Sequence, residues 1–293
     1  MTATAIDSVL VAGAGSIGSG VARSFVAAGV RTRVLSRDPG RLEGHLEGAE
    51  ISATLPAAAP DLVVECLPET LELKHRFYAQ VEAAWQGAPV LATNTSSLPL
   101  PELAAPLAYP GRFVGMHYMY PAHERGLLVE VIRTEDTADA VVESVMAALE
   151  RCGKPPIVLN RPAVGGLFNR LQHALLREVY YLIDQGVATP QQIDDMARRF
   201  IAPRMCITGL LQQKDISGLD THALAQRTLR PVLCNEAAPS PFLEARYVRG
   251  DWGLKTGRGF YDWSGADPAS VRTATAGKVA RIVALIKELE ENG

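Results

Sequence analysis

The stretch Val9-Leu10-Val11-Ala12-Gly13-Ala14-Gly15-Ser16-Ile17-Gly18 determines the fold that the rest of the sequence predicts. Its first four residues are apolar and predict a buried parallel strand, after which Gly13, Gly15 and Gly18 follow the spacing G-x-G-x-x-G. Apolar residues then recur every three or four positions through Phe25, which predicts a helix that packs against a sheet. A strand, a glycine turn and a helix in this order are typical of a dinucleotide-binding domain.

Each part of this turn has a role in holding a dinucleotide. Gly13 permits the tight turn, Gly15 leaves space for the pyrophosphate, and Gly18 lets the helix approach the strand. The backbone N–H groups of Ser16, Ile17 and Gly18 begin the helix and face the anion. The alternative is a glycine turn with a purely structural role, but the strand and helix around it favour the dinucleotide.

The composition excludes several classes of protein. A chain of 293 residues with 47% hydrophobic residues is sufficient for one large domain or two smaller ones. A net charge of −3, with lysine and arginine dispersed, argues against a nucleic-acid partner. The chain has no apolar run of about 18 residues and no basic leader, so we expect a cytoplasmic protein that does not contact the membrane.

The cysteines and histidines do not indicate a metal site. Cys66, Cys152, Cys206 and Cys234 are far apart and lack CxxC spacing, which predicts reduced thiols rather than a disulfide framework or a zinc site. The six histidines contain no pair at metal-ligand spacing. We therefore expect no bound metal.

The end of the second predicted strand, Thr32–Ser36, determines which nicotinamide cofactor fits. An acidic residue at this position would bind the ribose hydroxyls of NAD, but the chain has Ser36 followed by Arg37. The guanidinium of Arg37, with Arg41 nearby, suits the 2′-phosphate of NADP, so the sequence favours NADP. In the alternative, Arg37 is a solvated loop residue and Asp38 is the acidic residue that binds the ribose hydroxyls, so NAD stays a possible cofactor.

Polar residues follow another predicted strand. Residues 61–65 and 89–92 form apolar runs that predict strands, and the second run leads into the polar segment Asn94–Ser97. Ligands bind at the carboxyl ends of strands in an open parallel sheet, so this segment is placed where chemistry occurs. The alternative is an ordinary turn or helix cap.

Two further predicted strands carry a candidate acid/base pair. His117 lies near the end of Arg112–Pro121, and Glu130 lies inside Leu127–Ile132. A lone histidine at a strand end is usually structural, but a carboxylate within an apolar strand is costly unless it is paired. Paired with Glu130, His117 would move a proton while the carboxylate orients its ring.

Several motifs together carry a family resemblance. They span nearly the whole chain: GAGSIGSG at 13–20, VVECLPE at 63–69, TNTSS at 93–97, GMHYMYP at 115–121, LVEVI at 128–132, FNRL at 168–171, GLD at 218–220 and GLKTGRGFYDW at 253–263. With these motifs in this order, the chain resembles the 3-hydroxyacyl-CoA dehydrogenase family. The resemblance implies a Rossmann domain, a helical C-terminal domain that forms a dimer, and hydride transfer between a nicotinamide and a β-hydroxy or β-keto centre.

Carried over position by position, the resemblance implies roles for individual residues. His117 matches the catalytic histidine and Glu130 its partner. The other matched positions are Ser96 and Asn169 as substrate contacts, Glu69 and Lys74 on the cofactor side, and Asn94 beside the nicotinamide.

The chain departs from the family pattern around the substrate. Tyr120 replaces the asparagine of the family's HFFNP motif, and the following loop, which contains Arg125, has an additional residue. A loop of the family's pocket wall is replaced by Arg204–Gly209. We expect Tyr120, Arg125 and Arg204 to contact substrate, with either arginine able to bind a carboxylate.

A second departure lies between Ser36 and Glu65. Family members that use CoA insert a charged helical hairpin in this part of the chain, and the run here is too short to contain it. In its place the sequence predicts a short helix over residues 41–46 and one small strand over residues 50–53.

The segment Asn160–Gly166 resembles a hinge between domains. We expect an α/β Rossmann-type N-terminal domain over residues 1–160 and a smaller all-α substrate and dimerisation domain over residues 161–293. The apolar stripe from Val279 to Leu289 in the last predicted helix suits either the domain core or a homodimer seam.

These observations predict an NAD(P)-dependent oxidoreductase, specifically a ketoreductase for a polyketide-type or β-keto acid substrate, free or carrier-bound. One alternative is a short-chain 3-hydroxyacyl-CoA dehydrogenase that binds CoA through fewer residues. Another is a non-catalytic cofactor-binding protein, as some crystallin-like relatives are, although the retained His117 and Glu130 argue against it.

Overall fold

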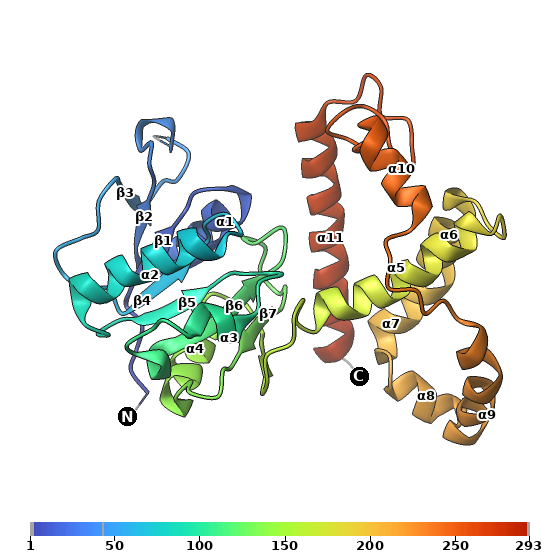
Figure 1. The fold of residues 1–293 in the computed structure, drawn as a ribbon, viewed down its shortest axis with the longest axis horizontal. Helices are drawn as coiled ribbons and strands as arrows, with labels where there is room; N and C mark the ends of the chain where they lie inside the picture. Colours follow the sequence, from blue (N-terminus) through green and yellow to red (C-terminus); the bar gives the residue numbers. More distant parts are fainter. Residues whose placement is uncertain (1–2, 43, 292–293) are drawn as a thin grey trace. The chain divides into compact units, whose positions relative to one another are not determined.

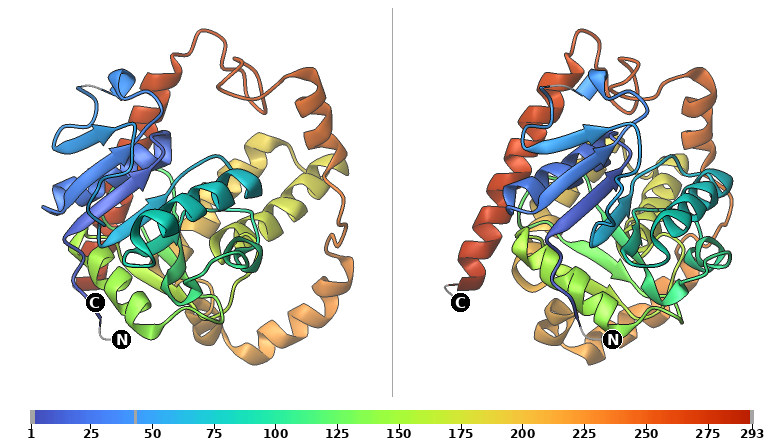
Figure 2. Two further views of the ribbon diagram at one scale, coloured as in Figure 1. Left: turned by 60° about the vertical axis from the view of Figure 1, so that its left-hand side comes forward. Right: turned by 90° about the vertical axis from the view of Figure 1, so that its left-hand side faces the viewer.

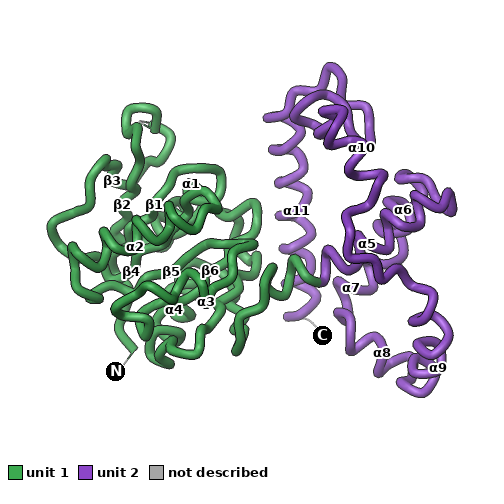
Figure 3. Tube along the Cα trace, in the orientation of Figure 1, with its two compact units in different colours: residues 1–170 green, residues 171–293 purple. Residues whose placement is uncertain are grey.

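A computed structural model describes residues 3–42 and 44–291. The chain divides into two compact units, Met1–Arg170 and Leu171–Gly293 (Figure 3). The predicted boundary at residue 160 falls earlier in the chain than this division, in the segment that follows the last strand.

A single sheet organises the first unit (Figure 1). In the part of the chain that the structure describes, the sheet has eight strands in the order β3-β2-β1-β4-β5-β6-β7-β8. Neighbouring strands are parallel except β6 and β7, which are antiparallel. The Rossmann-type fold predicted from the glycine motif is therefore confirmed. The strands are β1 (Ser8–Ala12), β2 (Arg31–Leu35), β3 (Ala49–Ser52), β4 (Leu62–Glu65), β5 (Val90–Thr93), β6 (Phe113–Tyr118), β7 (Val129–Ile132) and β8 (Pro156–Leu159).

Helices cover both faces of this sheet (Figure 2). One apolar cluster joins α1 and α4 to the sheet, and a second cluster joins α2 and α3 to its other face. Because side chains alternate between faces, the central strands are buried on both sides and read as continuous apolar runs. The helices are α1 (Ser16–Ala27), α2 (Leu71–Trp85), α3 (Leu100–Ala104) and α4 (Asp139–Arg151), with single 3₁₀ turns at Gly40–Leu42 and Pro110–Arg112.

The second unit is helical, as predicted. Thr189 caps one of its helices: its hydroxyl accepts from the N–H of Gln192, whose side chain accepts from the N–H of Thr189 in return. The elements are α5 (Phe168–Asp184), which begins in the first unit, α6 (Pro190–Met196), a π-helical turn (Ala197–Ile201), α7 (Ala202–Thr208), α8 (Gln212–Ser217), α9 (Leu219–Leu229), a 3₁₀ turn (Arg230–Val232), α10 (Pro241–Arg249) and α11 (Pro268–Glu291).

One local prediction needs correction. The helix predicted over residues 41–46 is reduced to the 3₁₀ turn Gly40–Leu42, and Glu43 lies outside the described residues. The segment Arg204–Gly209, which replaces a loop of the family's pocket wall, is mostly part of α7 and ends at Gly209 with φ +64°. Between β2 and β4 the described chain contains only this 3₁₀ turn and β3, so the helical hairpin is absent from the described residues, as predicted.

Among the described residues, no helix combines the length and the apolar character that crossing a bilayer requires.

Candidate functional site

The glycine turn between β1 and α1 leaves space for a dinucleotide. Gly13 has φ +101°, and a Cβ there would lie 2.5 Å from the carbonyl oxygen of Cys66. A Cβ on Gly18 would lie 2.0 Å from the oxygen of Gly13, so only glycine permits this close approach of helix and strand. A Cβ on Gly15, by contrast, would meet nothing within 4 Å. No side chain caps the start of α1, so the N–H groups of Ser16, Ile17 and Gly18 are available to a pyrophosphate.

The tip of β2 presents one arginine to solvent. Arg37 is exposed, and among the described residues no carboxylate forms an ion pair with it. The Asp38 carboxylate accepts from the N–H of Arg41 at 3.4 Å, and the hydroxyl of Ser36 donates to the carbonyl of Asp38 at 3.2 Å. The local hydrogen bonds thus fix the turn and leave the guanidinium of Arg37 unpaired.

His117 and Glu130 form a buried pair. They are directly opposite each other in the antiparallel pairing of β6 and β7, and Nδ1 of His117 lies 2.9 Å from Oε2 of Glu130. Only 6% of His117 and 1% of Glu130 is exposed. The pairing predicted from the sequence is therefore present, and no described residue forms a hydrogen bond with Nε2 of the ring.

The other oxygen of Glu130 binds the beginning of α5. Its Oε1 accepts from the N–H groups of Leu167 at 2.8 Å and Phe168 at 2.7 Å. Gly166 makes room for the carboxylate, since a Cβ there would lie 2.2 Å from Oε2. Burial opposes ionisation of Glu130, but the hydrogen bond from His117 and those from the helix start outweigh it, so the pKa of Glu130 lies below its usual value.

The remaining predicted substrate and nicotinamide residues surround the ends of β5 and β6. Oδ1 of Asn94 accepts from the N–H of Tyr118 at 2.8 Å, which joins the ends of the two strands. Ser96 is exposed on the turn after β5, and Asn169 is half-buried in the first turn of α5. Tyr120 is 57% exposed in the loop after β6.

Glu69 and Lys74, predicted on the cofactor side, belong to one network, in which Lys74 is buried and Glu69 is partly exposed. Nζ of Lys74 lies 2.7 Å from Oε1 of Glu65 and 3.1 Å from Oε2 of Glu69. Sequence reasoning missed Glu65, which is fully buried at the end of β4. The same sequence pattern that indicated Glu130, a carboxylate in an apolar strand, would have identified Glu65.

The two predicted carboxylate-binding arginines lie in different units. The guanidinium of Arg125 lies against Gly153, where a Cβ would be 2.6 Å from Nε. Arg204 is on α7 in the second unit, and its guanidinium lies 3.9 Å from the centre of the Phe200 ring. Because Arg204 and His117 belong to different units, the substrate role of Arg204 stays a prediction.

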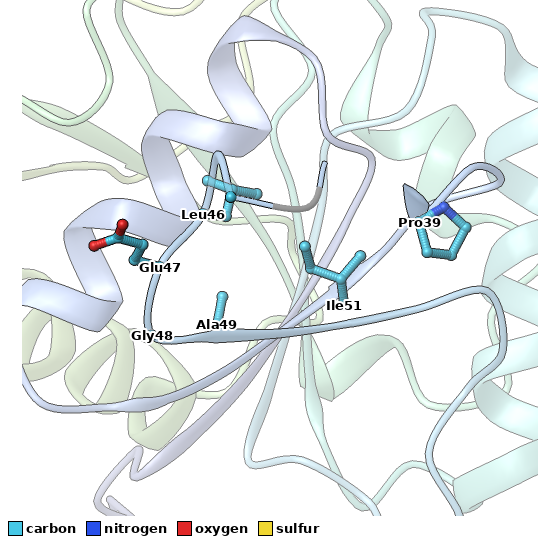
Figure 4. Close-up of a pocket in the computed structure, with 7 residues that line it drawn as sticks. Pro39, Leu46, Glu47, Gly48, Ala49 and Ile51 are labelled. Carbon is cyan, nitrogen blue, oxygen red and sulfur yellow. The ribbon is translucent and has the colours of Figure 1, made fainter. Parts of the chain in front are cut away.

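A hollow of about 390 Å³ lies beside β3, away from this site (Figure 4). Its lining includes the apolar side chains of Pro39, Leu46 and Ile51. None of the predicted site residues lines it. Within the described ranges, no group of three or more His, Cys, Asp or Glu side chains is arranged to hold a metal ion.

Two family models match the chain. Residues 49–162 match the model described as 3-hydroxyacyl-CoA dehydrogenase, NAD binding domain. Residues 165–263 match the model described as 3-hydroxyacyl-CoA dehydrogenase, C-terminal domain.

Individual proteins match over most of their length. A probable 3-hydroxybutyryl-CoA dehydrogenase of Bacillus subtilis (strain 168) is 32% identical, over 88% of this chain and 98% of the relative. A 5-formyl-3-hydroxy-2-methylpyridine 4-carboxylate 5-dehydrogenase of Mesorhizobium japonicum is 26% identical, over 97% of this chain and 99% of the relative. A crystal structure of an enzyme described as a 5-dehydrogenase of that pyridine carboxylic acid and an NAD⁺-dependent dismutase has the same fold, with TM-score 0.88 and 24% identity over 97% of this chain and 99% of that one.

The pH dependence of stability reports the environment of Glu130. Its pKa is lower in the folded chain than in the unfolded chain, so ionised Glu130 stabilises the fold. This contribution to the free energy of unfolding is fully present above the unfolded pKa of about 4.3 and is lost as pH falls toward the folded pKa. We expect the free energy of unfolding to decrease less below this pH in Glu130→Gln than in the wild type. Denaturant unfolding at a series of acidic pH values measures this.

Glu72→Gln is the matched control for that measurement, because Glu72 is exposed on α2. It should keep the wild-type pH dependence. An equal loss of stability in wild type and Glu130→Gln would show that Glu130 is not held as a low-pKa carboxylate.

Proposed function

The chain belongs to the 3-hydroxyacyl-CoA dehydrogenase family, and we propose that it interconverts a β-keto and a β-hydroxy group with His117 as the acid/base. Membership confirms the predicted resemblance and the predicted class, an oxidoreductase that acts on CH–OH groups. The observation that carries the proposal is the buried hydrogen bond of 2.9 Å between Nδ1 of His117 and Glu130, which leaves Nε2 free for substrate. A purely cofactor-binding role would not need this pair.

In the proposed reaction, Glu130 fixes the orientation of the ring. Its carboxylate accepts from Nδ1–H, so Nε2 is the atom that gives or takes the proton. In the reducing direction, Nε2–H of the imidazolium protonates the carbonyl oxygen as it becomes a hydroxyl, and oxidation reverses this transfer. Ser96 and Asn169 hold that oxygen by hydrogen bonds.

The nicotinamide, when bound, supplies or accepts the hydride. The N–H groups of Ser16, Ile17 and Gly18 would hold the pyrophosphate at the start of α1. Asn94 would contact the nicotinamide through its amide N–H₂, since its Oδ1 already accepts from the N–H of Tyr118.

We further propose a homodimer. The second unit exposes many large apolar side chains, including Leu211 at 81%, Val248 at 81% and Ile282 at 52%. Burying such side chains against a second copy is favourable, at roughly 25 cal/mol per Å² of apolar surface.

For the substrate, we propose a polyketide-type compound or a β-keto acid, free or carrier-bound, rather than a plain acyl-CoA. The absence of a helical hairpin between β2 and β4 supports this, because the family's CoA users place it there. The Mesorhizobium relative also supports it, since its name gives a pyridine carboxylate as substrate. The Bacillus relative favours the alternative, a short-chain 3-hydroxyacyl-CoA dehydrogenase.

Substitution of His117 tests the proposed mechanism. His117→Ala should reduce kcat by a factor on the order of 10²–10⁴, because the proton transfer is lost, while dinucleotide affinity stays unchanged. Steady-state kinetics and a fluorescence titration with dinucleotide measure the two effects. His222→Ala, on α9 in the second unit, should retain wild-type kcat, and substantial turnover by His117→Ala would refute the assignment.

Comparing two substrates that share a β-keto group tests the substrate class. We expect free acetoacetate to be reduced with a higher kcat/KM than acetoacetyl-CoA, because the residues that hold CoA are missing. Arg125→Ala should raise KM for the free acid, since a charge-assisted hydrogen bond to its carboxylate is lost. Faster turnover of the CoA ester, with KM for the acid unchanged in the variant, would identify a short-chain 3-hydroxyacyl-CoA dehydrogenase.

Dinucleotide selectivity tests the role of Arg37. The unpaired guanidinium of Arg37 favours NADP, whereas the family's NAD binding domain and the NAD⁺ dependence of the solved pyridine enzyme favour NAD. If Arg37 binds the 2′-phosphate, Arg37→Ala should raise the Kd for NADPH by a factor of roughly 10–100 and leave that for NADH unchanged. Arg31→Ala, at the other end of β2, is the control. Tighter binding of NADH than NADPH by the wild type would establish NAD instead.

A further inference from the structure

We infer that Glu65, Lys74 and Glu69 form a relay that positions the turn carrying Ser96, and that Lys74 acts through Glu69 rather than as a ligand of the dinucleotide. The inference rests on the proposed function, because it takes Ser96 as a substrate contact. It reassigns Lys74 from the cofactor side, where the family resemblance alone would put it.

The ammonium of Lys74 has no direction left for a ligand. The residue is 1% exposed, and Nζ lies 2.7 Å and 2.9 Å from the two carboxylate oxygens of Glu65. It also lies 3.1 Å from Oε2 of Glu69 and 3.5 Å from the carbonyl oxygen of Leu67. A lysine has three N–H donors, and these acceptors use all of them.

Glu65 is itself held rigidly, so it fixes the position of Lys74. Oε2 of Glu65 accepts from the hydroxyls of Tyr78 at 2.9 Å and Thr93 at 2.7 Å. Its Oε1 accepts from the N–H of Leu67 at 2.6 Å. Glu65 ends β4, while Tyr78 is on α2 and Thr93 is on β5, so the buried carboxylate joins three elements around the ammonium.

Glu69 carries the effect from Lys74 to the turn after β5. While Oε2 faces Lys74, Oε1 accepts from the N–H of Ser96 at 2.7 Å, the hydroxyl of Thr95 at 2.9 Å and the N–H of Ser97 at 3.3 Å. The hydroxyl of Ser96 lies 3.3 Å from the same oxygen. The Glu69 carboxylate thus joins the turns that follow two neighbouring parallel strands, and it shares the ammonium of Lys74 with Glu65.

The charge on Glu69 is maintained by these same contacts. Burial alone would raise its pKa, but the N–H of Ser96 and the ammonium of Lys74 outweigh it, so the pKa lies below its usual value. Glu69 therefore stays ionised and accepts from the Ser96 turn throughout the physiological pH range.

A double-mutant cycle between Glu69 and Ser96 tests the relay. Glu69→Ala should lower kcat/KM at least tenfold while the Kd for the preferred dinucleotide changes less than twofold. If Glu69 acts through Ser96, the double variant Glu69→Ala/Ser96→Ala should be no worse than the more damaging single variant. Glu69→Gln keeps an oxygen that can accept from the N–H of Ser96, so it should recover part of the loss. Glu72→Ala, at an exposed position in the first turn of α2, should leave kcat/KM and Kd at wild-type values.

Lys74 requires a paired substitution. Lys74→Met alone leaves the Glu65 carboxylate buried without its counter-charge, whereas Glu65→Gln/Lys74→Met removes both charges. This double variant should also lower kcat/KM without changing the Kd for dinucleotide, and should have no additional effect when combined with Ser96→Ala.

The outcomes separate this inference from the proposed function. A wild-type protein without nicotinamide-dependent turnover overturns the proposed function and the relay with it. Normal wild-type turnover, with variants that weaken dinucleotide binding tenfold and leave kcat/KM at saturating dinucleotide unchanged, overturns the relay alone and restores Lys74 as a cofactor ligand. Additive effects of Glu69→Ala and Ser96→Ala also overturn the relay.

Discussion

The need to satisfy one buried carboxylate determines how the site around His117 is built. Glu130 lies inside an apolar strand, where an unpaired charge would cost several kcal/mol, so every oxygen must find a donor. One oxygen is hydrogen-bonded to the imidazole of His117, and the other accepts hydrogen bonds from the N–H groups of Leu167 and Phe168. The same carboxylate therefore orients the proposed acid/base and fixes where α5, with Asn169 in its first turn, begins.

Glu65, the last residue of β4, is a second buried carboxylate in an apolar strand. Its oxygens accept from a lysine and two hydroxyls rather than from a histidine. In both places a buried charge joins its own strand to a neighbouring strand and to a helix or the start of one. Buried polar networks of this kind are costly if one member is missing, and they rigidify the surrounding turns when every member is paired.

The sequence was sufficient for the features that depend on local pattern. The glycine spacing and the alternation of apolar runs predicted the Rossmann-type sheet, and the rule that a buried carboxylate needs a partner predicted the pairing of His117 with Glu130. The rule was not applied to Glu65, so its partners were missed. Lys74 shows a limit of prediction from sequence pattern. It is nine residues from Glu65, and this spacing does not indicate that the intervening turn brings the two side chains into contact.

The antiparallel pairing of β6 and β7 explains how the chain tolerates an altered loop between its two key residues. Directly opposed residues on one face have Cβ atoms about 4.5–5.5 Å apart, close enough for an imidazole and a carboxylate to hydrogen-bond. A register shift of one residue would turn Glu130 to the opposite face of the sheet. The additional residue relative to the family must therefore be absorbed between Tyr118 and Val129, the last opposed pair of the two strands. Loop length can vary and change the substrate-facing side chains, while the opposition of His117 and Glu130 stays fixed.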